Sequence, residues 1–237
     1  MQPDSRSSFP ETSWARLRPG EAADANGRAA AFRVLAEGYL APTVAFLRHA
    51  LGRSESDAKD LAHDFFLWVL ESGFLSKADP ARGPFRGFLK TALRRYVIDA
   101  DRARAALRRG GGRSGSSLDA TDGTEPIATD KSPEEAFDDT WRAEVLGRAL
   151  SSTKVEMEAS GNGAAYLLFE EWLAAVDETF DHQAAAARHG ITRIDVSNRL
   201  ARAKARLRAH VMNIVRESTS SPLDLDQELR RLLGGDR

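Results

Sequence analysis

The sequence contains no cysteine, and this absence excludes several kinds of chemistry. A chain of 237 residues without a thiol can form no disulfide bond, use no thiolate nucleophile and bind no zinc through cysteine. Glycine-rich phosphate loops with a lysine are also missing, as is the sharp turn that carries a serine nucleophile. These classes of enzyme therefore have no support in the sequence. The lack of cysteine fits a reducing compartment, and we expect a cytoplasmic protein.

Long hydrophobic runs are absent as well. No apolar run approaches the ~20 residues that are needed to cross a bilayer. The first 25 residues are polar and lack the apolar core of a secretory signal. We therefore expect neither a membrane partner nor a cleaved leader.

The net charge of the whole chain is only −1, but basic and acidic residues are strongly segregated along it. Residues 82–113 contain ten basic and two acidic side chains, and residues 117–144 contain nine acidic and two basic ones. A second basic segment follows at 188–208, with seven basic residues and one acidic residue. Two basic segments favour two surfaces for a polyanion such as nucleic acid. Ordinary solvated helix faces are the alternative explanation.

Apolar residues recur with helical spacing along nearly the whole chain, and strand-like alternation does not persist anywhere. The pattern predicts an all-α protein of two small helical domains joined by a flexible linker. The expected boundaries are a polar N-terminal segment (1–27), a first domain (28–109), a flexible acidic linker (110–133), a second domain (134–216) and a tail (217–237). The linker is rich in Gly, Ser, Thr and Asp. A short amphipathic helix is expected in the tail, and we hypothesise that it docks on the protein's own domains.

Residues 180–196 predict a helix-turn-helix. Gly190 can adopt the positive φ that the turn requires, Thr192 can cap the second helix, and Ala186 and Val196 lie where the two helices would meet. The outer side of the second helix carries Arg193, Ser197, Asn198, Arg199, Arg202 and Arg206. These side-chain types suit phosphates and base edges in the major groove. An alanine-rich helix pair with a glycine turn can also be purely structural, so the motif alone leaves DNA binding open.

Three segments of the first domain carry a family resemblance. Residues 57–66 (DAKDLAHDFF) resemble the second conserved region of bacterial sigma factors, which docks on the clamp helices of the RNA polymerase β′ subunit. Residues 79–89 (DPARGPFRGFL) are similar to the entry of that region's DNA-melting helix, and 96–102 (YVIDADR) to the helix end that reads the −10 element. The helix-turn-helix takes the place of the family's fourth region. Residues 14–216 therefore resemble a small, two-domain extracytoplasmic-function (ECF) sigma factor. In detail, the chain looks most similar to a planctomycete-like subgroup of this family.

The resemblance implies a transcription initiation factor and not an enzyme, with no cofactor or metal. Its partners would be the polymerase core, through the β′ clamp helices and the β flap, and promoter DNA; an anti-sigma factor is a further candidate partner. Carried over by position, the core-binding residues are Asp60, His63, Asp64 and Phe65. The residues around the opened −10 strand are Arg86, Phe88, Lys90, Arg94, Arg95, Tyr96 and Arg102. The outer side of the helix-turn-helix would read the −35 element, with Arg199 and Arg202 at the most basic family positions.

The sequence departs from the family pattern at several of these positions. His63 stands where Gln is usual, Phe88 where Trp is usual and Arg95 where Asn is common. Asp195 and Ser197 replace a typical Thr and Lys, which weakens the expected phosphate contacts of the −35 helix. Individual base contacts therefore stay open.

Two other functions remain as alternatives. The chain could be a stand-alone helix-turn-helix regulator whose N-terminal helices only dimerise or sense. More remotely, the dipeptide His63-Asp64 occurs in HD-type metal-dependent phosphohydrolases, which need further His and Asp ligands brought together in space. Among the aromatic residues, Phe65 is expected to pack in the core, whereas Phe88 and Tyr96 could either pack or contact DNA.

Overall fold

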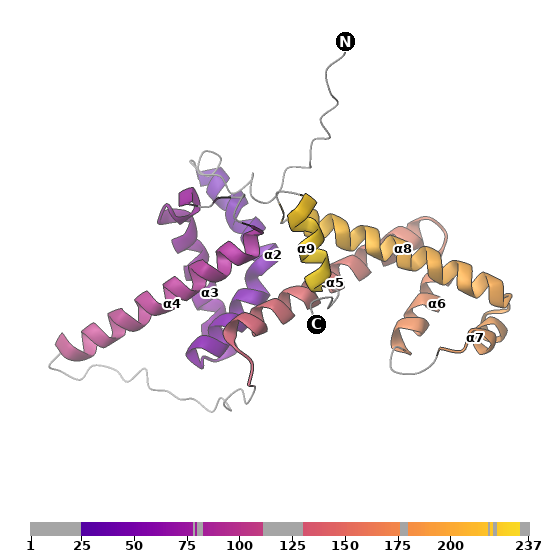
Figure 1. Ribbon diagram of the computed structural model, residues 1–237, viewed down its shortest axis with the longest axis horizontal. Coiled ribbons are helices and arrows are strands. Elements are labelled where there is room, and N and C mark those ends of the chain that lie inside the picture. The colour runs from indigo at the N-terminus through magenta and orange to yellow at the C-terminus, as the bar shows by residue number, and fades with distance from the viewer. Residues whose placement is uncertain are drawn as a thin grey trace, which may run out of the picture. The chain divides into compact units, whose positions relative to one another are not determined.

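The computed structural model describes residues 25–77, 79, 83–110, 130–175, 180–217, 219 and 222–232. Within these ranges all regular structure is helical and no strand occurs, which confirms the all-α prediction (Figure 1). Most of the expected N-terminal segment and of the expected linker lies outside the described residues.

The described residues form eight α-helices and one 3-10 helix. They are α2 (Ala25–Leu51), α3 (Glu55–Glu71), the short 3-10 helix η1 (Phe74–Lys77), α4 (Phe85–Gly110), α5 (Pro133–Ala159), α6 (Gly163–Ala174), α7 (His182–His189), α8 (Arg193–Glu217) and α9 (Pro222–Leu232). The amphipathic tail helix expected at the C-terminus is α9. Its apolar residues Leu225 and Leu232 are buried.

The chain forms two compact units, and their boundaries differ from the expected domains. Unit 1 comprises Met1–Glu144 and Arg216–Arg237, and unit 2 comprises Val145–Val215. The start of α5 and the whole of α9 therefore belong with the N-terminal helices. The expected domains placed the start of α5 in the second domain and α9 in a separate tail. The physical reason is that acidic side chains of both segments pair with basic side chains of α4, as described below.

Unit 1 is built on a core of α2, α3 and α4. Ser54 caps α3, because its hydroxyl accepts a hydrogen bond from the backbone N–H of Asp57 at 3.1 Å. Phe65 and Phe66 of α3 and Phe85 of α4 are fully buried in this core. The aromatic side chains meet one another, for example Phe65 and Tyr96 with ring centroids 5.4 Å apart.

Helix α2 is the one described helix that is long and apolar enough to cross a membrane by length and mean hydropathy alone. The expectation that no segment reaches this level does not hold for α2. Its apolar residues have another explanation, because Leu35 and Leu47 are fully buried within unit 1. A core helix of a soluble protein passes the same test.

Unit 2 has its own apolar core. Its fully buried side chains include Leu168 and Phe169 of α6, Ala185 of α7, and Val196 and Ala203 of α8. Helices α7 and α8 meet through the small and branched residues that the sequence analysis identified, since Ala186 is 4% exposed and Val196 is 0% exposed.

Candidate polymerase and nucleic-acid interfaces

The first candidate surface is the outer side of α3. Asp60, His63 and Asp64 are exposed there, and their spacing of three and four residues places them on one side of the helix. The His63 ring stacks on Phe32 of α2, with centroids 5.9 Å apart and ring planes 13° apart, which fixes its orientation. Phe65, the fourth residue assigned to this contact, is fully buried and holds α3 in place from within.

Leu67 extends this surface and was not anticipated from the sequence. It lies on α3 three residues after Asp64, and it is 46% exposed. An exposed leucine between acidic residues gives the outer side of α3 an apolar contact point as well as charge. The signal available in the sequence was that Leu67 falls outside the apolar stripe of this helix.

The second candidate surface is α4, where the aromatic residues assigned to the −10 strand are partly buried. Phe88 packs against Phe74 of η1 with centroids 4.9 Å apart. Tyr96 packs against Phe65 and, at 5.7 Å, against Trp68. Burial raises the pKa of the Tyr96 phenol, and the negative charge of Asp64 adds to this effect. Both rings are therefore packed on one side and accessible on the other.

The basic residues of α4 whose side chains the structure describes divide into two groups. Arg95 and Arg102 lie towards the C-terminal end and are well exposed, and both lie within 3.9 Å of Asp99. Exposed pairs of this kind contribute little stability, so these arginines are accessible to a polyanion.

The other group, Arg86, Lys90 and Arg94, is paired with carboxylates of unit 1. Arg86 donates to Asp138 at 2.6 Å and to both carboxylate oxygens of Glu228. Lys90 donates to both oxygens of Asp138, at 2.7 and 2.9 Å. Arg94 donates to Glu134, and this hydrogen bond holds the pKa of the Glu134 carboxyl below its ordinary value. Arg86, expected at the −10 strand, is only 5% exposed.

The third candidate surface is the helix-turn-helix, whose turn is formed by backbone hydrogen bonds. Gly190 has φ 62°, and the N–H groups of Ile191 and Gly190 donate to the carbonyls of Ala186 and Ala187. This is the Schellman arrangement, which favours glycine at the left-handed position. The predicted end of α7 at Gly190 is confirmed.

Both helices of the motif are capped by side chains at their N-termini. The Asp181 carboxylate accepts from the backbone of Gln183 and Ala184, at 2.8 and 3.1 Å. Thr192 and Asp195 form a reciprocal capping box on α8: the Asp195 N–H donates to the Thr192 hydroxyl at 3.1 Å, and the Thr192 N–H donates to the Asp195 carboxylate at 3.2 Å. The Thr192 hydroxyl also donates to this carboxylate, at 2.7 Å. These hydrogen bonds lower the pKa of Asp195, chiefly through the Thr192 hydroxyl.

The orientation of α7 is further held by Glu171 of α6. Its carboxylate contacts His189 Nε2 at 2.8 Å and accepts from Arg188. These contacts lower the pKa of Glu171, with the His189 hydrogen bond as the largest cause. These contacts hold α7 and the turn after it in place, and the turn in turn fixes the position of the start of α8.

The outer side of α8 carries the residues assigned to the −35 element. Arg193, Ser197, Asn198 and Arg202 are exposed, while Arg199 and Arg206 are half-buried. The last two, with Arg202, line a hollow of about 350 Å³ beside the Gly161–Asn162 turn. Arg206 also contacts Glu156 at 3.4 Å, so part of its charge is already paired.

Ile194 is the residue of this surface that sequence reasoning missed. It is 73% exposed on the first turn of α8, next to Arg193 and one helical turn before Ser197 and Asn198. The N-terminal residues of a recognition helix contact base edges, and an aliphatic side chain there can contact a thymine methyl group. The available signal was an isoleucine outside the apolar stripe of the helix.

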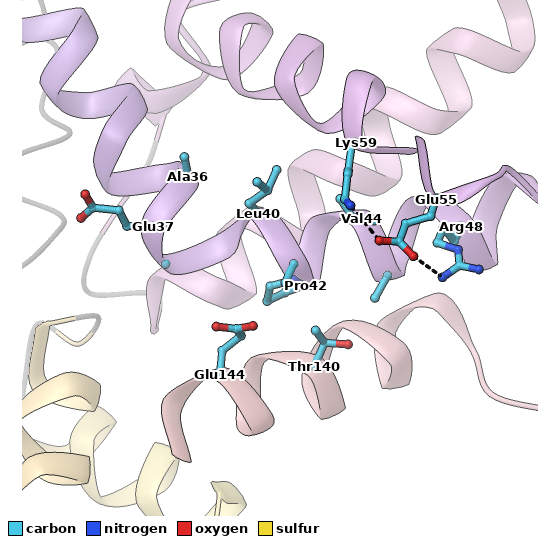
Figure 2. Close-up of a pocket in the computed structure, with 13 residues that line it drawn as sticks. Ala36, Glu37, Leu40, Pro42, Val44, Arg48, Glu55, Lys59, Thr140 and Glu144 are labelled. Carbon is cyan, nitrogen blue, oxygen red and sulfur yellow. Dashed lines mark ion pairs between the residues drawn. The ribbon is translucent and has the colours of Figure 1, made fainter. Parts of the chain in front are cut away.

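A separate hollow of about 470 Å³ lies in unit 1 between α2, α3 and the start of α5. Apolar residues of α2 line it, and Thr140 and Glu144 close it from α5 (Figure 2). At one end Glu55 lies between Lys59, at 2.7 Å, and Arg48, at 3.8 Å. Three of its charged groups are thus paired with one another. Over the described residues as a whole, no group of three or more His, Asp or Glu side chains could hold a metal ion.

The fold is thus all-helical, with a basic outer side on the α7–α8 pair of unit 2 and an aromatic and basic helix in unit 1. The model of the ECF sigma factor family matches residues 23–159, which is more than half of the chain, and the protein belongs to this family. Members of the family are non-enzymatic factors that act with RNA polymerase in transcription initiation. No curated protein and no solved structure gave a match to the chain.

The extent of this match matters for the individual sites. It includes every residue assigned to the polymerase core and to the −10 element, and it ends at Ala159, the last residue of α5, before the helix-turn-helix. Family membership removes the phosphohydrolase alternative, since these factors are not enzymes. The planctomycete-like subgroup stays a prediction.

Proposed function

We propose that this sigma factor binds the RNA polymerase core, recognises promoter −10 and −35 elements and promotes melting of the DNA, in the cytoplasm. The family match over residues 23–159 carries the proposal, because it spans the helices that present both the exposed side of α3 and the basic side of α4. The chain would lend promoter specificity to the polymerase, which performs the catalysis.

The assignment of the polymerase contact rests on the exposure and spacing of α3. Asp60 and Asp64 offer two carboxylates one helical turn apart, with Leu67 next to them. The proposed partner surface is the β′ clamp helices, with the β flap as a second contact and an anti-sigma factor as a candidate competitor. Phe65 is buried beneath this surface, and it would support the contact by holding α3 in place.

The assignment of the −10 surface rests on the combination of aromatic and basic residues on α4. Opened DNA needs aromatic faces against which unstacked bases can lie and cations that follow the backbone. Phe88 and Tyr96 each have one packed and one accessible side, and Arg95 and Arg102 are exposed nearby on the same helix. The −35 element is assigned to α8, whose start is capped and whose outer side is polar and basic.

The decisive experiment mixes the purified protein with bacterial polymerase core and separates the complexes by size-exclusion chromatography at moderate salt. Co-elution at a one-to-one ratio supports the proposal and justifies a search for the promoter. Separate elution, combined with tight binding to duplex DNA by the free protein, supports the stand-alone regulator instead. The observation that favours this second candidate is the complete helix-turn-helix of unit 2.

A further inference from the structure

The basic face of α4, defined as Arg86, Lys90 and Arg94, is covered by carboxylates of the same chain. Two of the three carboxylates, Glu134 and Asp138, come from the start of α5, and the third, Glu228, comes from α9. All six residues belong to unit 1. Three positive charges therefore meet three negative charges within one compact unit.

The pairing is regular along the two helices. The basic residues of α4 are four residues apart, and so are Glu134 and Asp138 of α5. Residue 94 pairs with 134 and residue 90 with 138, so the two series run in opposite directions. Carboxylates one helical turn apart present evenly spaced negative charge to a basic surface, as a nucleic-acid backbone does.

The pairing is also enclosed where α9 joins it. Glu228 is 0% exposed and Arg86 is 5% exposed. The Arg86 guanidinium lies 4.7 Å from the centroid of the Trp141 ring, which covers its face. A nucleic acid cannot reach Arg86 while α9 and the start of α5 are in place.

Helix α9 is suited to leave this position. It has 11 residues, and an isolated helix of this length is marginal in water, so its helical state depends on docking. The contacts that hold it include the buried Leu225 and Leu232 and the ion pair of Glu228 with Arg86. An anion that competes for Arg86 would remove the polar part of this attachment.

We propose that α9 and the start of α5 are an intramolecular competitor of nucleic acid, which closes the basic face of α4 in the free protein. The face opens when a DNA backbone displaces the carboxylates, beginning with Glu228. This inference rests on the proposed function in one respect, namely that the occupant which replaces the acidic cover is the opened promoter strand.

The test measures binding of the full-length protein to a fluorescent single-stranded 20-mer of mixed sequence, by anisotropy at low and moderate salt. The variant is Glu228→Gln, which removes one charge with little change of shape. The matched control is Asp226→Asn, which removes the same charge from the exposed side of α9, where Asp226 pairs with Arg230 at 2.8 Å. We expect Glu228→Gln to bind about tenfold more tightly than wild type, and Asp226→Asn to stay within about twofold of it.

Equal or weaker binding by a folded Glu228→Gln protein would overturn the proposal, as would equal gains in both variants, which would indicate general charge repulsion only. Should the variant fail to fold by circular dichroism, wild-type hydrogen exchange decides: amides of α9 should lose protection when the oligonucleotide is added, and unchanged protection contradicts the competition. Core binding by chromatography is a separate readout. If the protein fails to bind polymerase but behaves as expected in the DNA test, the proposed competition by α9 stands and the proposed sigma function falls.

Discussion

Arg86 and Glu228, 142 residues apart in the chain, form an ion pair inside unit 1 in which two guanidinium nitrogens donate to the two carboxylate oxygens. The pair joins the first turn of α4 to α9. Two charges removed from water are costly, and their attraction offsets this cost only when the geometry is good and the other donors are satisfied. Asp138 and Trp141 supply those further contacts to Arg86.

We expect loss of one partner of this pair to destabilise the protein more than loss of both. Arg86→Ala leaves the Glu228 carboxylate buried without its cation and should lower the free energy of unfolding by about 3 to 5 kcal/mol. The double variant Arg86→Met with Glu228→Leu should recover a large part of that loss, because apolar side chains need no compensation there. Urea titrations followed by circular dichroism give both values. A double variant no more stable than Arg86→Ala would show that the pair itself stabilises the fold.

Substitution of the exposed acidic residues of α3 should weaken polymerase binding without unfolding unit 1. The variant Asp60→Asn with Asp64→Asn should raise the Kd for the core at least tenfold, because it removes both charges from the proposed contact. Glu55→Gln is the control, since Glu55 lies on the opposite side of α3 and pairs with Lys59. Affinity measured by fluorescence titration should change for the first variant only. An unchanged Kd in the double variant would remove the docking assignment.

The capping box of α8 should make the helix-turn-helix sensitive to acid. The pKa of Asp195 is below its ordinary value of 3.8, so its contribution is complete above that value and is lost as the pH falls through the lowered pKa. Thr192→Ala should destabilise unit 2 by about 1 kcal/mol at neutral pH and by less at low pH. Thermal melts of wild type, Thr192→Ala and Thr192→Ser from pH 7 down to pH 2 check this. A loss of the same size at every pH would contradict the role of the carboxylate.

The basic outer side of α8 should contact phosphates through Arg202. Arg202→Ala should weaken duplex binding about equally for all sequences and reduce the slope of log K against log salt by about one. Arg208 is the control, because it is exposed on the same helix but outside the assigned set. Binding isotherms at four salt concentrations, with polymerase holoenzyme and promoter DNA, give the slopes. Identical slopes for both variants would show that Arg202 makes no specific phosphate contact.

The exposed Ile194 should affect sequence preference and not stability. Ile194→Ala should leave the melting temperature of unit 2 nearly unchanged, because the side chain is 73% exposed. It should reduce the preference for the −35 element over a variant with thymine replaced by uracil, which lacks the methyl group, by up to about 0.8 kcal/mol. Competition binding with the two duplexes measures this difference. Equal discrimination by wild type and Ile194→Ala would exclude a methyl contact.

Much of the local structure was predictable from short-range patterns. The cap at Ser54, the glycine turn at Gly190 and the capping box of Thr192 and Asp195 each depend on residues within three or four positions of one another. The burial of Phe65 and Val196 followed from helical periodicity. These features are local, so their physical cause is visible in the sequence itself.

The pairing of charges was not predictable in the same way. The sequence showed a basic segment at 82–113 followed by an acidic one at 117–144, but it did not show that the two would pair. In the structure the start of α5 instead pairs with Lys90 and Arg94, and α9 adds Glu228 to Arg86. Periodicity predicts which face of a helix carries a charge, but it does not predict which other helix will pack against that face.

The sequence by itself therefore determined the helices, their caps, the helix-turn-helix and the family resemblance, because these depend on neighbouring residues and on the order of motifs. Only the tertiary structure decided which basic residues are exposed and which are covered. Arg95 and Arg102 face solvent, whereas Arg86 is enclosed by a residue from the other end of the chain. The reason is physical: burial and ion pairing are set by the packing of segments that are distant in sequence.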